Sequence, residues 1–386
     1  MKKANVPNST YFCTLPFSGA QINEFGVVTP CCNWDFNDRK GWPKLEDGGL
    51  EKAVQHPRFQ EVRNNMLEQK PTSGCRKCFD NERAKSQSFR LWTLERDKEW
   101  IKESQQRNLF DKDFFEMRYL DSVFSILCNL SCRMCSSSVS STYSKIVEPH
   151  KKVLKTPQLD LYDIDFSKLS YLKFVGGEPL MEPKHDQFIE KITQEDVDIP
   201  NLSLIYHTNA TMLPNKKVQA VWKKCKSIQI NLSIDGYGDI NWKQRPGPYT
   251  WQDVEKVCKQ YRLWAREWKN IKIRVSSVIT KINVFHLHEL EQWADTFWDK
   301  DMHDKDHSLF EAHCIEHPGE LSICDWHDNL ERKTQIKKYL QNIKRPYLRD
   351  HILYWLENVS SKTAFDYNIK SKRLDKYWKY DIDKYL

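Results

Sequence analysis

From about Tyr119 onward, short apolar or β-branched runs alternate with longer stretches whose apolar positions recur at helical spacing. This alternation is typical of repeated strand–helix units built around a parallel sheet. The pattern predicts six strands, at Tyr119–Leu127, Tyr171–Val175, Leu202–His207, Ser227–Ile234, Ile271–Ile279 and Leu309–Ile315. It predicts five helices between them, at Val139–Val147, His185–Thr193, Lys216–Lys224, Trp251–Trp268 and Phe285–Phe297.

Strand–helix–strand crossovers are right-handed, so successive units curl the sheet progressively. Six of them favour an α/β fold with an open, partial (β/α)6 barrel rather than a closed barrel of eight strands. Active sites on such sheets lie at the carboxyl ends of the strands. The polar segments that follow the predicted strands are therefore the first places to look for chemistry.

The two ends of the chain have a different character. The first hundred or so residues place Cys13, Cys31, Cys32, Cys75 and Cys78 among turn-forming residues, which favours a small unit stapled by a metal. After Trp326 the chain is rich in lysine and aromatic residues, and several helices that pack on the barrel are expected there. We therefore expect a cysteine-rich region at 1–115, the barrel at 116–325 and a C-terminal helical extension at 326–386.

The composition is that of a soluble globular protein, with 39% hydrophobic and 29% charged residues and a net charge of +7. Basic and acidic residues are interleaved without a long basic tract, so no nucleic-acid partner is expected. No apolar segment resembles a signal sequence or reaches the roughly 18 residues of a membrane span, which favours a cytoplasmic protein. Twelve cysteines in such a protein indicate metal or redox chemistry rather than a disulfide scaffold.

The densest chemistry is the window from Cys128 to Cys135, which holds three thiols, at Cys128, Cys132 and Cys135, directly after the first predicted strand. A four-iron cluster is normally held by four cysteines, so three ligands leave one iron free to bind another molecule. Structural zinc requires four closed ligands, and no nearby cysteine or histidine completes this group. An iron–sulfur cluster with an open, catalytic iron is the favoured interpretation.

The Cys-x3-Cys-x2-Cys spacing after the first strand, with Gly176-Gly-Glu-Pro179 after the second, resembles the radical S-adenosylmethionine (SAM) superfamily. The resemblance implies that Cys128, Cys132 and Cys135 hold three irons of a [4Fe–4S] cluster and that the fourth iron chelates SAM. It also implies reductive cleavage of SAM to a 5′-deoxyadenosyl radical, which abstracts hydrogen from a substrate.

The same resemblance suggests which side chains contact SAM. Met134 replaces the usual aromatic residue whose backbone lies near the adenine, and Ala210 replaces the usual glycine after Asn209. The implied SAM contacts are Met134, Gly176, Gly177, Glu178, Asn209, Ser233, Asp235 and Arg245.

In the amino-terminal region, Cys13, Cys32, Cys75 and Cys78 resemble the ligands of twitch or SPASM-type modules, which hold an auxiliary [4Fe–4S] cluster. Neighbouring side chains in an extended segment point in opposite directions, so only one of Cys31 and Cys32 is expected to be a ligand. Cys32 is the predicted ligand, and nothing in the sequence separates it from Cys31. A four-cysteine zinc site is the alternative. Glu82 and Arg90 are expected to brace this module.

These features lead to three functional hypotheses. The first is a radical SAM enzyme with oxidoreductase-like chemistry that modifies a peptide or protein and receives electrons from a flavodoxin or ferredoxin. The second is the same chemistry on a small metabolite, sugar or nucleotide. The third, from another class, is a non-catalytic binding protein whose cysteines hold zinc. No catalytic acid or base can be assigned from the sequence.

Overall fold

The computed structural model describes residues 11–35, 38, 40–83, 88–150, 156–297, 310–326, 328–359, 367–380 and 382. Leu309, the predicted start of the last strand, lies outside the described residues. So do residues 1–10 of the expected cysteine-rich region.

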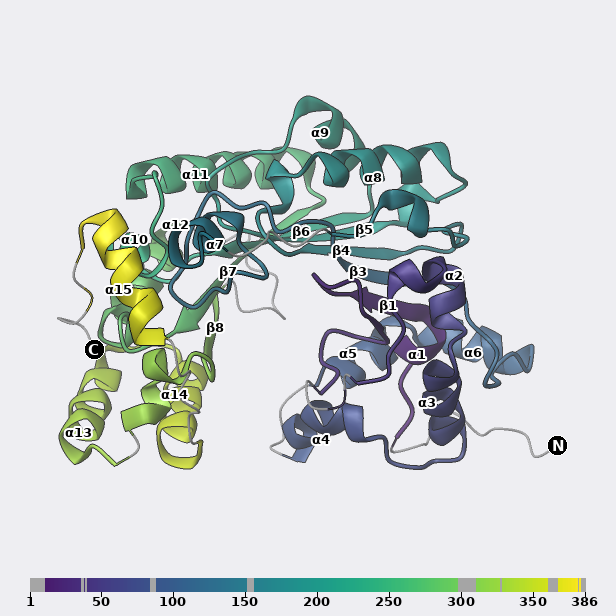
Figure 1. Ribbon diagram of the computed structural model, residues 1–386, viewed down its shortest axis with the longest axis horizontal. Helices are drawn as coiled ribbons and strands as arrows, with labels where there is room; N and C mark the ends of the chain where they lie inside the picture. Colours follow the sequence, from purple (N-terminus) through teal and green to yellow (C-terminus); the bar gives the residue numbers. More distant parts are fainter. Residues whose placement is uncertain are drawn as a thin grey trace.

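An eight-stranded sheet in the order β2-β1-β3-β4-β5-β6-β7-β8 forms the centre of the protein (Figure 1). Its strands are β1 Gly19–Ile22, β2 Val28–Thr29, β3 Tyr119–Val123, β4 Tyr171–Val175, β5 Ser203–Thr208, β6 Ser227–Ser233, β7 Ile271–Ile279 and β8 Phe310–Cys314. All neighbouring strands are parallel except the hairpin of β1 and β2. The expected α/β fold with a mostly parallel sheet is confirmed.

Helices between the strands cover one face of this sheet (Figure 1). They are α8 Pro183–Gln194, α9 Lys216–Trp222, α11 Trp251–Trp268 and α12 Leu287–Phe297. Helices α7 Ser141–Val147 and α10 Asp239–Gln244 instead adjoin the loops that follow β3 and β6. Alternate strand residues point toward them, so the ring of Phe174 in β4 packs on His185 of α8 and that of Tyr206 in β5 packs on Trp222 of α9. This aromatic layer belongs to the main hydrophobic core.

The opposite face of the sheet is polar. Asp121 of β3 lies beside Lys173 of β4 in the strand register, and their side chains form an ion pair with a 2.8 Å N–O distance. Burial and the nearby Lys173 lower the pKa of His207 in β5 to about 3, and Arg274 in β7 adds to this effect. Arg274 donates to Glu311 of β8 at 3.1 Å. Ionisable groups from five strands therefore share this face.

Most predicted elements are present, and three of them, β4, β7 and α11, have the predicted bounds. The first predicted strand was too long, because β3 ends at Val123 rather than Leu127. The carbonyls of Ser125 and Leu127 instead accept hydrogen bonds from the backbone of Gly177 and Glu178. Helix α10 was not predicted.

The amino-terminal region contributes two strands to the central sheet, which the sequence did not predict. Strand β1 pairs in parallel with β3, placing Gly19 beside Tyr119. The helices of this region are α1 Leu15–Ser18, α2 Gly49–Val54, α3 Pro57–Leu67, α4 Arg76–Arg83, α5 Phe89–Arg96 and α6 Lys98–Gln106. The buried guanidinium of Arg63 in α3 joins the first three of these helices, because it donates to the carbonyls of Pro16 and Val54.

The C-terminal extension is helical, as expected, with α13 Leu330–Tyr339, α14 Pro346–Asn358 and α15 Tyr367–Trp378. Helix α14 packs near β8, whereas α15 lies beside α7, close to the segment that follows β3 (Figure 1). In the part of the chain that the structure describes, none of the helices has the length and apolar character needed to cross a bilayer.

Candidate functional site

The loop that carries Cys128, Cys132 and Cys135 is fixed on both sides by hydrogen bonds. The backbone amides of Ser131 and Arg133 donate to the carbonyls of Pro246 and Gln244, each at 2.9 Å. At its start, the amide of Cys128 donates to the hydroxyl of Ser141, at the beginning of α7, at 3.1 Å. Residues 128–135, which we call the cluster loop, are thus held between α7 and the segment that follows α10.

The three thiols of the cluster loop are sheltered and close enough to influence one another. Burial, followed by the neighbouring Cys132 thiolate, raises the pKa of Cys128 to about 12. Burial also raises the pKa of Cys132 and Cys135, while the Arg245 cation acts in the opposite direction at both. At neutral pH these thiols are protonated, so metal binding would release protons.

The donor set fits a cluster with one open iron, because three soft thiolates from one loop suit iron–sulfur ligation. Among the described residues, no three cysteine, histidine or acidic side chains are already gathered at metal-ligating distances. The ligands of a four-iron cluster bind separate irons, so they need not surround a single metal-ion position.

Gly176 and Gly177 bring the end of β4 against the backbone that leads into the cluster loop. A Cβ atom on Gly177 would lie 2.1 Å from the carbonyl oxygen of Leu127, and one on Gly176 would lie 2.6 Å from that of Ser125. Gly176 also has a φ of +121°, which side-chain-bearing residues rarely adopt. In this structure the immediate role of both glycines is this close approach.

Glu178 and Asn209 connect the ends of β4 and β5 to the cluster loop. The carboxylate of Glu178 is buried and accepts hydrogen bonds from the Asn209 amide at 2.7 Å and the Thr208 hydroxyl at 2.8 Å. Burial nevertheless raises its pKa to about 7. The side-chain nitrogen of Asn209 lies 2.8 Å from the Asn129 side-chain oxygen and 4.0 Å from the Cys128 sulfur.

Asp235 and Arg245 form a buried ion pair next to the second cysteine of the loop. Arg245 Nε lies 2.5 Å from Asp235 Oδ2, and Arg245 Nη1 lies 3.8 Å from Cys132 Sγ. The other carboxylate oxygen of Asp235 accepts from the Val278 amide at 2.7 Å. Burial disfavours the Arg245 charge, but Asp235 and the Cys132 thiolate outweigh it and raise the arginine pKa.

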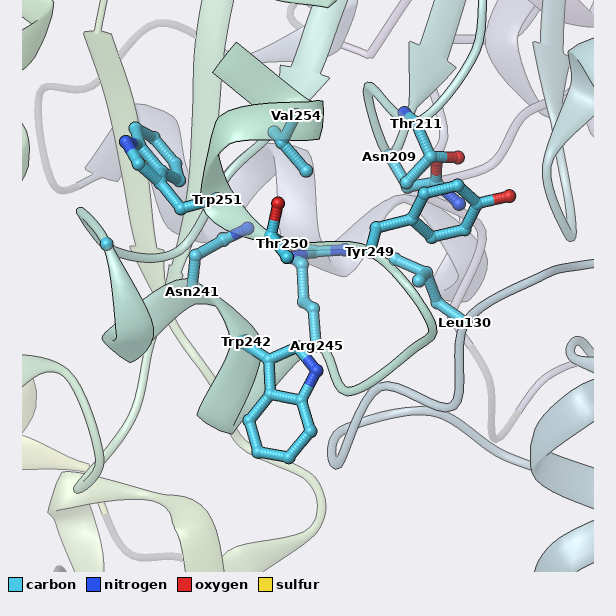
Figure 2. Close-up of a pocket in the computed structure, with 11 residues that line it drawn as sticks. Leu130, Asn209, Thr211, Asn241, Trp242, Arg245, Tyr249, Thr250, Trp251 and Val254 are labelled. Atoms are coloured by element: carbon cyan, nitrogen blue, oxygen red, sulfur yellow. The ribbon is translucent and has the colours of Figure 1, made fainter. Parts of the chain in front are cut away.

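A small cleft, open to solvent, lies beside this ion pair (Figure 2). It lies between the segment after β5, the cluster loop and the start of α11. Its lining residues are Leu130, Asn209, Thr211, Gly238, Asn241, Trp242, Arg245, Tyr249, Thr250, Trp251 and Val254. Of the predicted SAM contacts, Asn209 and Arg245 line it.

The remaining predicted contacts surround the same region without lining the cleft. Ser233 ends β6 and lies opposite Ser276 of β7 in the register. Met134 packs against a small apolar cluster of Ile282, Leu321 and Ile382.

Sequence reasoning missed three polar residues at this site, Asn129, Thr211 and Tyr249. The side-chain amide of Asn129 donates to the hydroxyl of Thr211 at 2.7 Å and to that of Tyr249 at 2.9 Å. Asn129 lies inside the cysteine motif and Thr211 lies two residues after Asn209, so proximity in sequence could have indicated both. Tyr249 is 120 residues from Asn129 and carries no local signal.

In the amino-terminal region, the structure places Cys31 with Cys13, Cys75 and Cys78. Burial and the surrounding thiolates raise the pKa of Cys31 well above its usual value, and Cys32, Cys75, Cys13 and Cys78 contribute to this in that order. The loop that follows Cys31 is joined to the segment that leads into Cys75, because the Asp35 amide donates to the carbonyl of Gly74 at 3.0 Å.

Cys32, the predicted ligand, points elsewhere. Its sulfur lies 3.7 Å from Lys173 Nζ, and burial raises its pKa to about 11 while Lys173 acts to lower it. Cys31 and Cys32 thus face opposite directions, as expected, but the structure groups Cys31 rather than Cys32 with the other thiols. The selection of Cys32 stays a prediction, and these interactions favour Cys31 as its alternative.

Glu82 and Arg90 brace the amino-terminal unit as expected. Arg90 Nε donates to Glu82 Oε1 at 3.0 Å, and Arg90 Nη1 donates to the carbonyl of Phe12 at 3.0 Å. Because Phe12 precedes Cys13 and Glu82 follows Cys78, this arginine ties together two of the segments that carry the thiols.

Comparison with known proteins supports the chemistry of the cluster loop. Residues 122–295 match the family model of the Radical SAM superfamily, and this range includes the cluster loop, Asn209, Asp235 and Arg245. An uncharacterized protein of Methanocaldococcus jannaschii is 26% identical over 179 residues, which cover 44% of this chain and 56% of that protein.

Two solved structures show weaker similarity. The protein anSMEcpe with bound AdoMet is 15% identical, with a TM-score of 0.39, over 57% of this chain and 59% of the other. SuiB of Streptococcus suis bound to S-adenosylmethionine is 16% identical, with a TM-score of 0.36, over 79% of this chain and 64% of the other. The chain spans less than two thirds of the length of each of these three proteins.

The family match indicates a radical SAM domain within residues 122–295 of the chain. That family implies SAM and one [4Fe–4S] cluster.

Proposed function

We propose that this enzyme cleaves SAM reductively at a [4Fe–4S] cluster held by Cys128, Cys132 and Cys135 and then abstracts hydrogen from a substrate. The observation that carries the proposal is the cluster loop itself, whose three thiols lie beside the Asp235–Arg245 pair and Asn209. When bound, cluster and SAM together supply the 5′-deoxyadenosyl radical.

The residues around the loop have distinct roles in this proposal. The guanidinium of Arg245 is held by Asp235, so it offers a fixed positive charge to the carboxylate of SAM. The nucleoside is proposed to lie against the open side of the cleft in Figure 2, where the lining residues Trp242, Tyr249 and Trp251 offer aromatic surface to the adenine. Glu178, with a pKa near 7, can meet the amino group of SAM with its ionised form.

In this proposal strands β3 to β8 form the partial barrel, and the polar face of the sheet is the substrate chamber. Asp121, Lys173, Arg274 and Glu311 offer charges of both signs there. Within the part of the chain that the structure describes, Oδ1 of the buried Asp121 carboxylate has no hydrogen-bond partner. Such a surface suits a substrate with both donors and acceptors, and a peptide or protein segment is our first choice. A small polar metabolite, sugar or nucleotide is the alternative.

The amino-terminal thiols are proposed to hold an auxiliary [4Fe–4S] cluster, with Cys13, Cys31, Cys75 and Cys78 as ligands. The grouping of Cys31 with the other three supports this set. Four cysteines suit structural zinc equally well, so metal analysis decides between them. A flavodoxin or ferredoxin is proposed as the electron donor, and the net charge of +7 favours an acidic one.

The test is anaerobic reconstitution with iron and sulfide, followed by incubation with SAM and dithionite. The wild-type protein is expected to form 5′-deoxyadenosine, measured by chromatography, and the triple variant Cys128→Ser, Cys132→Ser, Cys135→Ser is expected to form none. Cys225→Ala removes a buried cysteine outside both thiol groups and is the matched control. Undiminished 5′-deoxyadenosine in the triple variant would reject the proposal.

A further inference from the structure

The last described helix, α15, lies directly on the outer side of the cluster loop. Arg133 Nη1 donates to the hydroxyl of Ser371 at 3.2 Å, and Arg133 Nη2 lies 2.5 Å from the carboxylate of Asp375. The indole nitrogen of Trp378 donates to the hydroxyl of Ser131 at 2.8 Å. These hydrogen bonds join α15 to the cysteine motif, which lies about 240 residues earlier in the sequence.

One face of α15 makes all of these contacts. Ser371, Leu374, Asp375 and Trp378 are spaced as the residues along one side of a helix are. Lys372, Lys376 and Tyr377, on the remaining surface, are exposed. The sequence of α15 is therefore patterned to cover the cluster loop.

Arg133 is the centre of this contact on the loop side. Its side chain is only 1% exposed, and its Nε donates to the carbonyl of Lys243 at 2.7 Å. The ring of Tyr380, just after α15, lies 5.6 Å from its guanidinium. A buried charge of this kind is tolerable only while its partners stay in place.

The same helix also reaches the third cysteine of the motif. Leu374 is buried in an apolar cluster with Tyr143 and Val147 of α7, and Cys135 and Trp378 pack against this cluster. Farther along the chain, Ile382 belongs to the cluster that Met134 touches. The C-terminal segment thus contacts Met134 and Cys135, the last two residues of the motif.

We infer that α15 is the outer wall of the iron–sulfur site and that Arg133 and Asp375 are the positioning pair that keeps this wall in place. The inference rests on the proposed function, because it assumes a cluster on Cys128, Cys132 and Cys135. Solvent exposure and packing around the sulfur ligands control how fast a cluster is lost and at what potential it is reduced. The C-terminal extension therefore protects the cluster, although it supplies none of its ligands.

The test measures access to the cluster in the full chain rather than turnover. After anaerobic reconstitution, iron is extracted with the chelator bathophenanthroline disulfonate, and the coloured complex is followed with time. Asp375→Asn removes the charge that holds Arg133. Leu374→Ala removes the apolar side chain that packs in the cluster next to Cys135. Lys372→Ala, on the exposed side of the same helix, is the matched control.

In Asp375→Asn, about four irons per chain are expected to be extracted about tenfold faster than in the wild type, since a buried arginine without its partner favours local opening. Leu374→Ala is expected to change the rate in the same direction, and Lys372→Ala to match the wild type. Hydrogen exchange at the amides of α15 shows independently whether the helix has loosened.

Iron extraction at the wild-type rate from a variant whose α15 amides exchange rapidly would overturn the inference. A wild-type protein that takes up no iron and sulfide at the cluster loop would instead overturn the proposed function. The two failures are therefore distinguishable.

Discussion

Arg245 is held in a buried ion pair by Asp235, 2.5 Å away, and also reaches within 3.8 Å of the Cys132 sulfur. The two residues come from the end of β6 and the end of α10, so this pair connects two elements to the cluster loop. Arg245 thus carries a positive charge that is balanced by Asp235 and turned toward the proposed cofactor site.

Replacing Asp235 by asparagine is expected to destabilise the protein. Asp235→Asn leaves the Arg245 charge buried without its partner, which costs about 3 to 5 kcal/mol. Urea unfolding followed by circular dichroism measures the loss. Asp239→Asn, an exposed carboxylate at the start of α10, should change stability by less than about 0.5 kcal/mol. Equal losses in both variants would contradict the role of the ion pair.

The metal content should distinguish Cys31 from Cys32. If each thiol group holds a [4Fe–4S] cluster, the reconstituted wild-type protein contains about eight irons per chain. Cys31→Ser should reduce this to about four, whereas Cys32→Ser should leave it at about eight. Anaerobic iron, sulfide and zinc determination on the same samples provides the measurement. Zinc in place of the lost iron would show that the amino-terminal thiols form a zinc site, and loss of iron only in Cys32→Ser would reverse the assignment.

Glu178 should make stability dependent on pH. Its pKa is about 7 in the folded protein, against an ordinary value of 4.5, mainly because it is buried. The folded state therefore binds one proton more than the unfolded state between these values, and the free energy of unfolding falls as pH rises from 4.5 to 7. The expected contribution is a decrease of about 2 to 3 kcal/mol over that range.

The variant Glu178→Gln cannot titrate at this position and is the comparison for that effect. We expect the wild type to lose stability relative to Glu178→Gln as the pH rises from 4.5 to 7. The measurement is the difference in unfolding free energy between the two proteins at several pH values. A difference that is constant with pH would show that Glu178 does not titrate in this range.

Gly177→Ala should disturb the start of the cluster loop. The added Cβ would lie 2.1 Å from the backbone oxygen of Leu127, so the backbone before Cys128 must move. We expect a loss of about 2 to 4 kcal/mol in stability, from overpacking against backbone, together with lower iron content after reconstitution.

Gly41→Ala is the control for the Gly177 prediction. Gly41 has a positive φ of +79°, but no atom lies within 4 Å of an added Cβ. It should therefore lose only about 1 to 2 kcal/mol and keep its iron. A Gly177→Ala protein with normal iron content would show that the close approach of the two backbones is not required.

The sequence predicted the elements whose packing produces a regular pattern. Strand β7 alternates buried and more exposed residues over its whole length, and α11 carries its buried residues at helical spacing, so both have the predicted bounds. Strand β1 is only four residues long and fully buried, so its pairing with β3 depends on tertiary contacts that no local pattern reveals. The predicted end of β3 was too late, because mostly apolar residues continue along the chain after the last residue that pairs in the sheet.

The candidate site was predictable where chemistry follows a motif. The three cysteines, Gly176, Gly177 and Asp235 follow strands directly, and the fold brings them together. The side to which Cys31 or Cys32 points depends on the twist of one short segment, which residue types do not determine. Tyr249 enters the cleft from a loop far along the chain, and Asp375 reaches Arg133 from a helix that the sequence marked only as an extension.

The pairing of β1 with β3 has a consequence for how this protein can be divided. Strand β3 is an interior strand only because β1 occupies its free side. A fragment that begins after the cysteine-rich region would expose the unpaired backbone of β3 as a new sheet edge, and such edges promote aggregation. The boundary expected near residue 115 therefore separates two regions of sequence but does not separate two independently soluble units.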